Sequence, residues 1–180
     1  MADISYRLYV LQKLTEHLQG ITPLNQYPYD LSQSIFRGRS IFSGTEPLPM
    51  VSILESPRPD HAILAGEDGK MRSEKWHLLL QGWVADDINN PTDPAYALVA
   101  AVEKRLGDLK AIKEGSGRPV DPAVYMLGPG ANGRGTLITC LEFGPPVVRP
   151  PTEQVSSKAF FYLPVYVGLT VDSTQPYIIR

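Results

Sequence analysis

The chain has 180 residues, 43% of them hydrophobic, which suits one domain with a core of ordinary size. Its formal net charge of -2 and the lack of a Lys/Arg block disfavour tight binding to nucleic acid. Cys140 is the single cysteine and cannot form an internal disulfide, so we expect a buried small side chain in a protein made in a reducing compartment. No signal pattern and no run of about twenty apolar residues occurs, so we expect a soluble, cytoplasmic protein without a membrane partner.

The first predicted element is a helix that begins after Asp3, a residue suited to cap it, and ends at Gly20. Its apolar side, at spacings of three and four, would consist of Ile4, Leu8, Leu11, Leu14 and Leu18. The stretch "SIFRGRSIF", residues 34–42, predicts a short strand or an ordered arm, and "MVSILE", residues 50–55, predicts a strand.

Residues 57–72 are rich in turn formers and mixed charge, which predicts a long excursion between two strands. The strand that follows, "KWHLLLQGWVA", is apolar on both faces and is therefore expected to be central and covered on both sides. One face would carry Trp76, Leu78, Leu80, Gly82 and Val84, and the other His77, Leu79, Gln81 and Trp83. Asp93 and Pro94 suit the cap and first position of a second helix, whose apolar stripe is Leu98, Val102, Leu106 and Leu109.

After a Gly/Pro-rich link, residues 123–127 and 136–144 predict two strands joined by a glycine loop at 128–135. The last long strand, residues 158–171, is expected to be interrupted by Pro164, because proline lacks a backbone N–H. Residues 172–180 would form a C-terminal arm with exposed apolar side chains.

These elements predict one α+β domain over residues 1–180. We expect a mainly antiparallel or mixed sheet with both helices packed on one face, long loops and a C-terminal arm. The 17 prolines and 15 glycines also favour long loops.

The glycine loop contains a literal G-x-G-x-x-G at Gly128, Gly130 and Gly133. A dinucleotide site needs a helix after this motif, so that the helix N-terminus can hold the pyrophosphate. A strand-like segment follows here instead. We therefore interpret these glycines as a hairpin loop and expect no cofactor.

An enzymatic alternative comes from Pro59-Asp60 followed by Asp68-Gly69-Lys70, which has the residue order of the PD-(D/E)xK nucleases. In such enzymes two carboxylates hold Mg²⁺ and a lysine orients the attacking water. The geometry argues against this alternative, since Asp68 and Lys70 flank a glycine in a predicted turn.

No other catalytic or metal-binding set is evident. The three histidines stand far apart, on a helix, in a loop and on a strand, and with one cysteine they form no zinc spacing: His17, His61 and His77. Asp86 and Asp87 are explained by the turn "DDINNPTD" and by helix capping. The sequence therefore predicts no metal, no cofactor and no enzyme activity.

Two stretches resemble the tail terminator (tail completion) proteins of long-tailed bacteriophages. One is "IFRGRSIFSGTEPLPMVSILESP", residues 35–57, where Arg-Gly-Arg leads to a strand that ends in Glu. The other is "LLLQGWVADDINNPTDPAYALVAAVEKRL", residues 78–106, which reads strand, Asp/Asn/Pro turn and helix. The predicted order of the remaining elements also agrees with this family.

The resemblance implies a structural virion protein at the head-proximal end of the tail, made in the host cytoplasm. Such proteins form a ring, usually of six subunits, that caps the tail tube, ends its polymerisation and provides a docking surface for the head-completion or connector proteins. The implied partners are other copies of the chain, the tail-tube protein and the head-completion protein. Genomic DNA would pass through the ring without sequence-specific binding. A second alternative is a self-associating α+β domain without these partners.

Charged and apolar residues outside the predicted core are the candidates for subunit or tail-tube contacts. Arg37 and Arg39 are spaced like two residues on one side of an extended segment, from which they would pair with acidic groups of a neighbouring subunit. The complete set of candidates is Arg37, Arg39, Asp60, Glu67, Asp68, Lys70, Arg72, Tyr177, Ile178 and Ile179.

Overall fold

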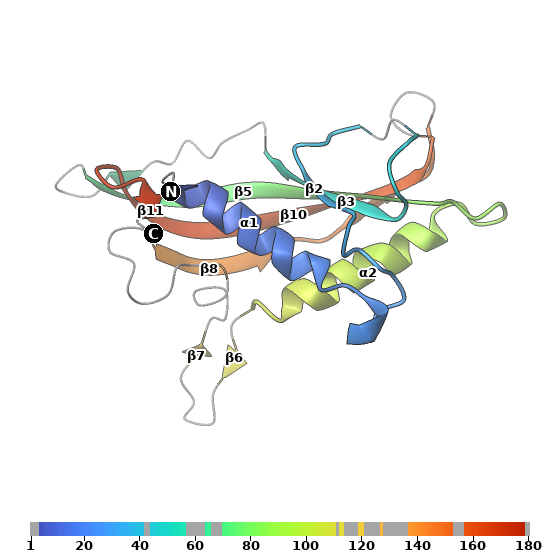
Figure 1. Ribbon diagram of the computed structural model, residues 1–180, viewed down its shortest axis with the longest axis horizontal. Coiled ribbons are helices and arrows are strands. Elements are labelled where there is room, and N and C mark those ends of the chain that lie inside the picture. Colours follow the sequence, from blue (N-terminus) through green and yellow to red (C-terminus); the bar gives the residue numbers. More distant parts are fainter. Residues whose placement is uncertain are drawn as a thin grey trace.

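A computed structural model describes residues 4–41, 44–56, 64–65, 70–110, 112–113, 119–120, 127, 137–152 and 157–178. The described chain forms a mixed sheet of seven strands with two α-helices on one of its faces (Figure 1). This confirms the predicted α+β class. The first and last described residues lie together at one end of the molecule, where Ile4 pairs with Ile178.

Two long strands form the centre of the sheet. β5 (Met71–Val84) and β10 (Ala159–Asp172) pair antiparallel without a break over 14 residues each. The free side of β5 pairs with β3 (Met50–Glu55) and β4 (Leu64–Ala65), and that of β10 pairs with β8 (Leu137–Phe143) and β9 (Val147–Arg149). β2 (Ile35–Arg37) lies parallel to β3 at the edge. The sheet is therefore five strands wide, with the order β2-β3-β5-β10-β8.

Shorter elements lie outside this sheet. β1 (Ile4–Ser5) pairs with β11 (Tyr177–Ile178), β6 (Ile112–Lys113) pairs with β7 (Pro119–Val120), and a 3-10 turn, η1 (Pro23–Asn25), follows the first helix.

The main core lies between the helices and one face of the sheet. Alternate residues of β5 and β10 point to this face, and the residues predicted to share it on β5 are buried there, for example Leu78 and Leu80. They form one apolar cluster with Leu14 of α1 (Tyr6–Gln19) and Leu98 of α2 (Asp93–Gly107). Burial of this layer is the main favourable contribution to folding.

The other face of the sheet is covered only in part. At one end Trp83 packs with Met50 and Phe160 in a small second cluster and is fully buried. Farther along β5, Leu79 and His77 are half-buried, and Lys75 is exposed. The predicted division of β5 into two faces is thus confirmed, while the expected cover of its second face is complete only near Trp83.

Helix α1 differs from the prediction at its start and in its buried side. Ile4 is in β1 rather than in the helix, and Ser5, not Asp3, caps α1 with its Oγ atom accepting from the N–H of Leu8. Leu8 is 42% exposed, while Tyr6, Val10, Leu14, His17 and Leu18 are buried. The helix is therefore turned relative to the predicted stripe, because its core side has to meet both β2 and α2.

Helix α2 agrees closely with the prediction. It spans Asp93–Gly107, Pro94 lies in its first turn, and the N-cap position is Thr92 rather than Asp93. All four residues of the predicted stripe are completely buried: Leu98, Val102, Leu106 and Leu109.

Pro164 does not interrupt β10, contrary to the prediction. The carbonyl oxygen of Pro164 accepts a hydrogen bond of 2.9 Å from the N–H of Gly144, which lies between β8 and β9. Since the N and O atoms of a strand residue point to the same side, the missing N–H of Pro164 faces this gap in the edge of the sheet. The ladder with β5 loses no hydrogen bond, and Pro164 keeps its register with Leu79.

The excursion predicted over residues 57–72 is shorter than expected. Met71 and Arg72 belong to β5, and Leu64 and Ala65 form β4, which pairs with Ser73 and Arg72. Residues 57–63 and 66–69 lie outside the described part of the chain, as do most of the strand predicted at 123–127 and the glycine loop at 128–135.

Candidate interaction surface

Arg37 and Arg39 do not share one side of an extended segment, contrary to the prediction. β2 ends at Arg37, and Gly38 has a φ angle of 77°, so the chain turns there. The guanidinium of Arg39 lies 4.0 Å from the centre of the Phe36 ring and 3.5 Å from Glu46. Because Phe36 and Arg37 point to opposite faces of β2, the two arginines do so as well.

Of the two arginines, only Arg37 is available for an outside partner. It is exposed and has no ion pair with any residue that the structure describes. Arg39 already has an acidic partner and an aromatic surface within its own chain. The prediction of a subunit contact therefore rests on Arg37.

Of the candidate contact residues in the predicted excursion, the structure describes only those at its C-terminal end. Asp60, Glu67 and Asp68 lie outside the described residues, and Arg72 is placed by its backbone in β5. Lys70 is exposed, and its carbonyl oxygen accepts hydrogen bonds from the N–H and the hydroxyl of Ser173 at 2.9 and 2.8 Å. These two bonds tie the start of β5 to the turn that follows β10.

The predicted C-terminal arm is attached to the beginning of its own chain. Ser5 pairs with Tyr177, Ile4 pairs with Ile178, and the N–H of Tyr6 donates to the carbonyl oxygen of Pro176 at 3.0 Å. Tyr177 remains 57% exposed, and Ile179 lies outside the described residues. A role of this arm in a subunit contact stays a prediction, with Tyr177 as its described candidate.

The turn before this arm is held by local hydrogen bonds. The Oδ1 atom of Asp172 accepts from the N–H and the hydroxyl of Thr174 at 2.8 and 2.6 Å. These hydrogen bonds lower the pKa of Asp172 below its usual value, because they favour the charged carboxylate. The turn is thus ordered where the arm leaves the sheet.

The sheet face away from the helices carries an apolar row that the sequence did not reveal as one surface. Leu54, Leu79 and Pro164 are directly paired across β3, β5 and β10, so their side chains stand next to one another. All three are half-buried. The alternation in the last strand could have indicated Pro164, but the pairing of strands distant in sequence brings the row together.

Polar and aromatic residues extend this face. The rings of His77 and Tyr166 meet edge to face at 4.6 Å, and the ammonium of Lys75 lies 4.6 Å from the Tyr166 ring and 3.6 Å from Glu142. The face therefore combines an apolar row with a paired cation and anion. Such a composition suits contact with another protein.

The loop between β5 and α2 is a second surface that sequence reasoning missed as a binding element. Residues 85–91 are all exposed, and Ile88 is 93% exposed. The signal was a single isoleucine among Asp, Asn and Pro residues, which alone indicates only a turn.

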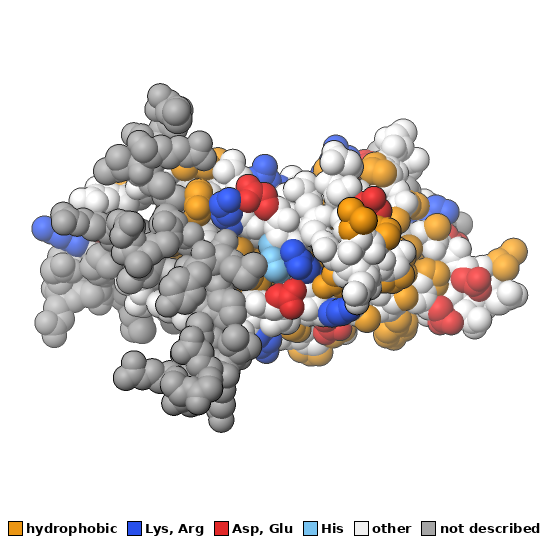
Figure 2. Space-filling view, turned by 60° about the horizontal axis from the view of Figure 1, so that its bottom comes forward, with side chains coloured by type: hydrophobic (Ala, Val, Ile, Leu, Met, Phe, Trp, Pro, Cys, Tyr) orange, Lys and Arg blue, Asp and Glu red, His pale blue; other side chains and the backbone are white. Residues whose placement is uncertain are grey.

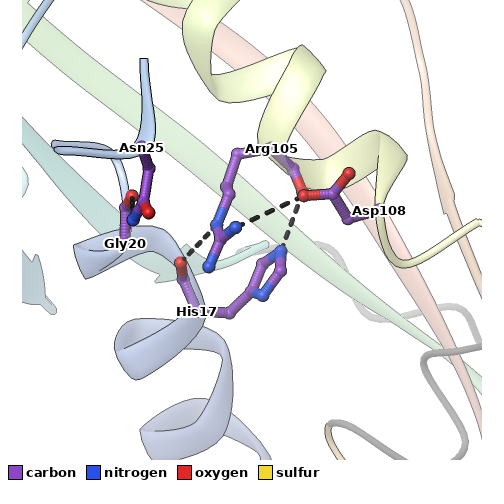
Figure 3. A network of polar contacts seen from close by, with 5 residues as sticks. All are labelled: His17, Gly20, Asn25, Arg105 and Asp108. Carbon is purple, nitrogen blue, oxygen red and sulfur yellow. Dashed lines mark hydrogen bonds and ion pairs between the residues drawn. The ribbon is translucent and has the colours of Figure 1, made fainter. Parts of the chain in front are cut away.

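The two helices are joined at their C-terminal ends by reciprocal hydrogen bonds (Figure 3). Nε2 of His17 donates to the carbonyl oxygen of Arg105 at 2.7 Å, and Nε of Arg105 donates to the carbonyl oxygen of His17 at 2.8 Å. Arg105 also pairs with Asp108 at 3.3 Å, and the amide of Asn25 donates to the carbonyl oxygen of Gly20 at 2.8 Å. Each helix end thus has its last carbonyl groups satisfied by the other helix or by the following turn.

This clasp leads to a pH-dependent stability. Burial lowers the pKa of His17 below its ordinary value, and the hydrogen bond to the Arg105 carbonyl opposes this only in part. Above pH of about 6.5, His17 is neutral in both states. As the pH falls below this value the unfolded chain takes up a proton more readily than the folded chain, so the free energy of unfolding decreases until the folded-state pKa is passed.

We therefore expect the free energy of unfolding, measured with urea, to be lower at pH 5.5 than at pH 7.5, and to change less in the variant His17→Gln. Glutamine can still donate a hydrogen bond but does not titrate. Equal pH dependence in the two proteins would contradict this role of His17.

The described residues contain neither a metal-binding cluster nor a helix that could span a membrane. Within the described ranges, no three His, Cys, Asp or Glu residues are placed to hold a metal ion together. None of the described helices has the length and apolar character needed to cross a membrane. Of the nuclease-like residues, Asp60 and Asp68 lie outside the described part of the chain.

Comparison with known proteins adds no relative. No protein-family model and no curated protein matches the chain.

Proposed function

We propose that the chain is a structural protein of a bacteriophage tail, a terminator that caps the tail tube. It would act as a ring of several copies of the chain, and its other partners would be the tail-tube protein and the head-completion protein. The ring would end tube polymerisation and then offer its outer surface to the head.

The observation that carries the proposal is the position of the two stretches that resemble tail terminators. The first contains β2 and β3, and the second contains the second half of β5, the loop that follows it and nearly all of α2. β3 and β5 pair from Met50 opposite Trp83 to Glu55 opposite Leu78. The two stretches thus lie side by side in the sheet, from β2 at its edge to β5 at its centre (Figure 1).

The structure of this unit is consistent with a scaffold for assembly. Helix α2 packs on β5 and β10, and its clasp with α1 joins both helices at their ends. The opposite face presents the row of Leu54, Leu79 and Pro164. A cap of this kind needs only shape and charge on a rigid support, so the proposal includes no catalytic step.

The proposal is tested by adding the purified protein to tail tubes assembled without a terminator. We expect density at one end of each tube in electron microscopy, and tubes that stop lengthening. Arg37→Glu should weaken capping, because it reverses the exposed arginine of β2. Arg149→Glu, which reverses an exposed arginine on the opposite edge of the sheet, is the matched control.

Tubes that keep growing with bare ends in the presence of the folded protein would contradict the proposed function. Equal capping by both charge-reversed variants would leave the function in place and remove Arg37 from the interface.

A further inference from the structure

The middle of the sheet face that lies away from the helices is apolar and only half-buried. The row of Leu54, Leu79 and Pro164 crosses it from β3 to β10, and Tyr166 follows Pro164 on the same face of β10. All four side chains are half-buried, while both described helices pack on the opposite face. Removing these side chains from water is favourable, so the face gains free energy when another surface covers it.

One cation and one anion stand on the two sides of β10 in this face. Lys75 of β5 lies opposite Gly168, and Glu142 of β8 lies opposite Tyr166. The Lys75 ammonium lies 4.6 Å from the centre of the Tyr166 ring and 3.6 Å from the Glu142 carboxylate. Their side chains keep exposed fractions of 49% and 59%. Each can therefore contact a charge on a covering surface as well.

This arrangement of charges is complementary to itself under a two-fold rotation. A rotation by 180° about an axis along β10 exchanges the β5 side of the face with the β8 side. A second copy placed face to face in this way sets Lys75 against the partner's Glu142 and Glu142 against the partner's Lys75. The strands of the two sheets then run almost parallel, as they do in aligned sheet packing. A contact between identical surfaces requires such self-complementarity.

We propose that two copies of the chain pair through this face, with the two-fold axis along β10. The apolar row supplies the favourable free energy of the contact. An exposed ion pair contributes little to affinity, but like charges in contact oppose association, so Lys75 and Glu142 select this orientation. A partner protein with a single sign of charge would repel one of the two side chains.

The pairing is separate from the ring contact assigned to Arg37. Arg37 is paired with Ile53, whose side chain belongs to the core between the sheet and the helices. It therefore points to the helix side of the edge strand β2, and a contact through it leaves the opposite face accessible. The pairing can form in solution without a tail tube, so it is tested independently of the proposed function.

The test measures the molar mass of the purified protein by sedimentation equilibrium over a range of concentrations. We expect the wild type to associate. Lys75→Glu and Glu142→Lys should each weaken association by about tenfold or more, because like charges then meet twice in the symmetric contact. An equimolar mixture of the two variants should associate again, since each acidic copy can pair with a basic copy. Such recovery cannot arise within one chain, because each variant has lost its own ion pair.

The matched controls are Lys13→Glu and Glu16→Lys. Lys13 and Glu16 form a surface ion pair at 2.7 Å on α1, on the other side of the molecule. Figure 2 shows this helix side, where cationic and acidic side chains lie next to one another. Both control variants and their mixture should associate like the wild type.

Loss of association in Lys75→Glu and in Glu142→Lys, with recovery in their mixture, would support the pairing. A wild type that stays monomeric at every concentration would overturn it. So would wild-type association in both variants, which would place the contact on another surface. Loss in each variant without recovery in the mixture would also overturn it, because the two charges would then act only within their own chain. None of these outcomes bears on the capping of tail tubes, which the separate assay with tubes decides.

Discussion

Replacing Leu98 by aspartate is expected to lower the free energy of unfolding by at least about 3 kcal/mol. Leu98 is completely buried between α2 and the sheet. A carboxylate there would lose its hydration and find no cation in the surrounding apolar cluster. Since small domains are stable by only about 5–15 kcal/mol, much of the protein would unfold at modest temperature.

The measurement is urea unfolding followed by circular dichroism, with Ala100→Asp as control. Ala100 is exposed on the same helix, so this variant introduces the same charge into water. It should lose less than about 1 kcal/mol, mainly through lower helix propensity. Similar losses in both variants would contradict the packing of α2 on the sheet.

A methyl group at Gly82 is expected to destabilise the domain by about 1–3 kcal/mol. Gly82 lies opposite Phe161 in the centre of the sheet, and the Phe161 ring is completely buried. A Cβ atom at Gly82 would come within 2.6 Å of Cζ of this ring and still closer to Cε1. The ring cannot move away without displacing the core, so Gly82→Ala forces strain on β5 or β10.

The clash can be isolated with a double-mutant cycle. Phe161→Leu alone should be destabilising, but adding Gly82→Ala to it should cost less than in the wild-type background. Gly107→Ala is a control, because a Cβ atom there meets no other atom within 4 Å at the end of α2. It should be neutral or slightly stabilising. Additive losses for Gly82 and Phe161 would show that the ring is not the source of the strain.

The candidate interface could be predicted from the sequence only in part. Arg37 is exposed as expected, whereas Arg39 folds back on Phe36 after the turn at Gly38. Nothing in the spacing of two arginines distinguishes these outcomes, because the turn depends on the φ angle of one glycine. Ile88 was overlooked for a different reason, since exposure of one apolar residue in a turn is not visible in a local pattern.

Local sequence patterns correctly predicted the elements in which buried positions recur at a regular spacing along the chain. The stripe of α2 from Leu98 to Leu109 and the two faces of β5 were predicted correctly, because each element has one regular period and packs against a broad neighbour. The strand at Met50–Glu55 was also predicted correctly.

Other features depended on which segments meet in space. The buried side of α1 includes Tyr6 and His17 because α1 contacts both β2 and α2, and the clasp gives His17 a partner 88 residues away. Pro164 stays in a continuous strand because its missing N–H faces the gap between β8 and β9. Position 82 has to be glycine because the Phe161 ring of β10 occupies the space that a Cβ atom would need. These three features depend on contacts between segments that are distant in the sequence, and the periodicity of side chains within one segment does not indicate such contacts.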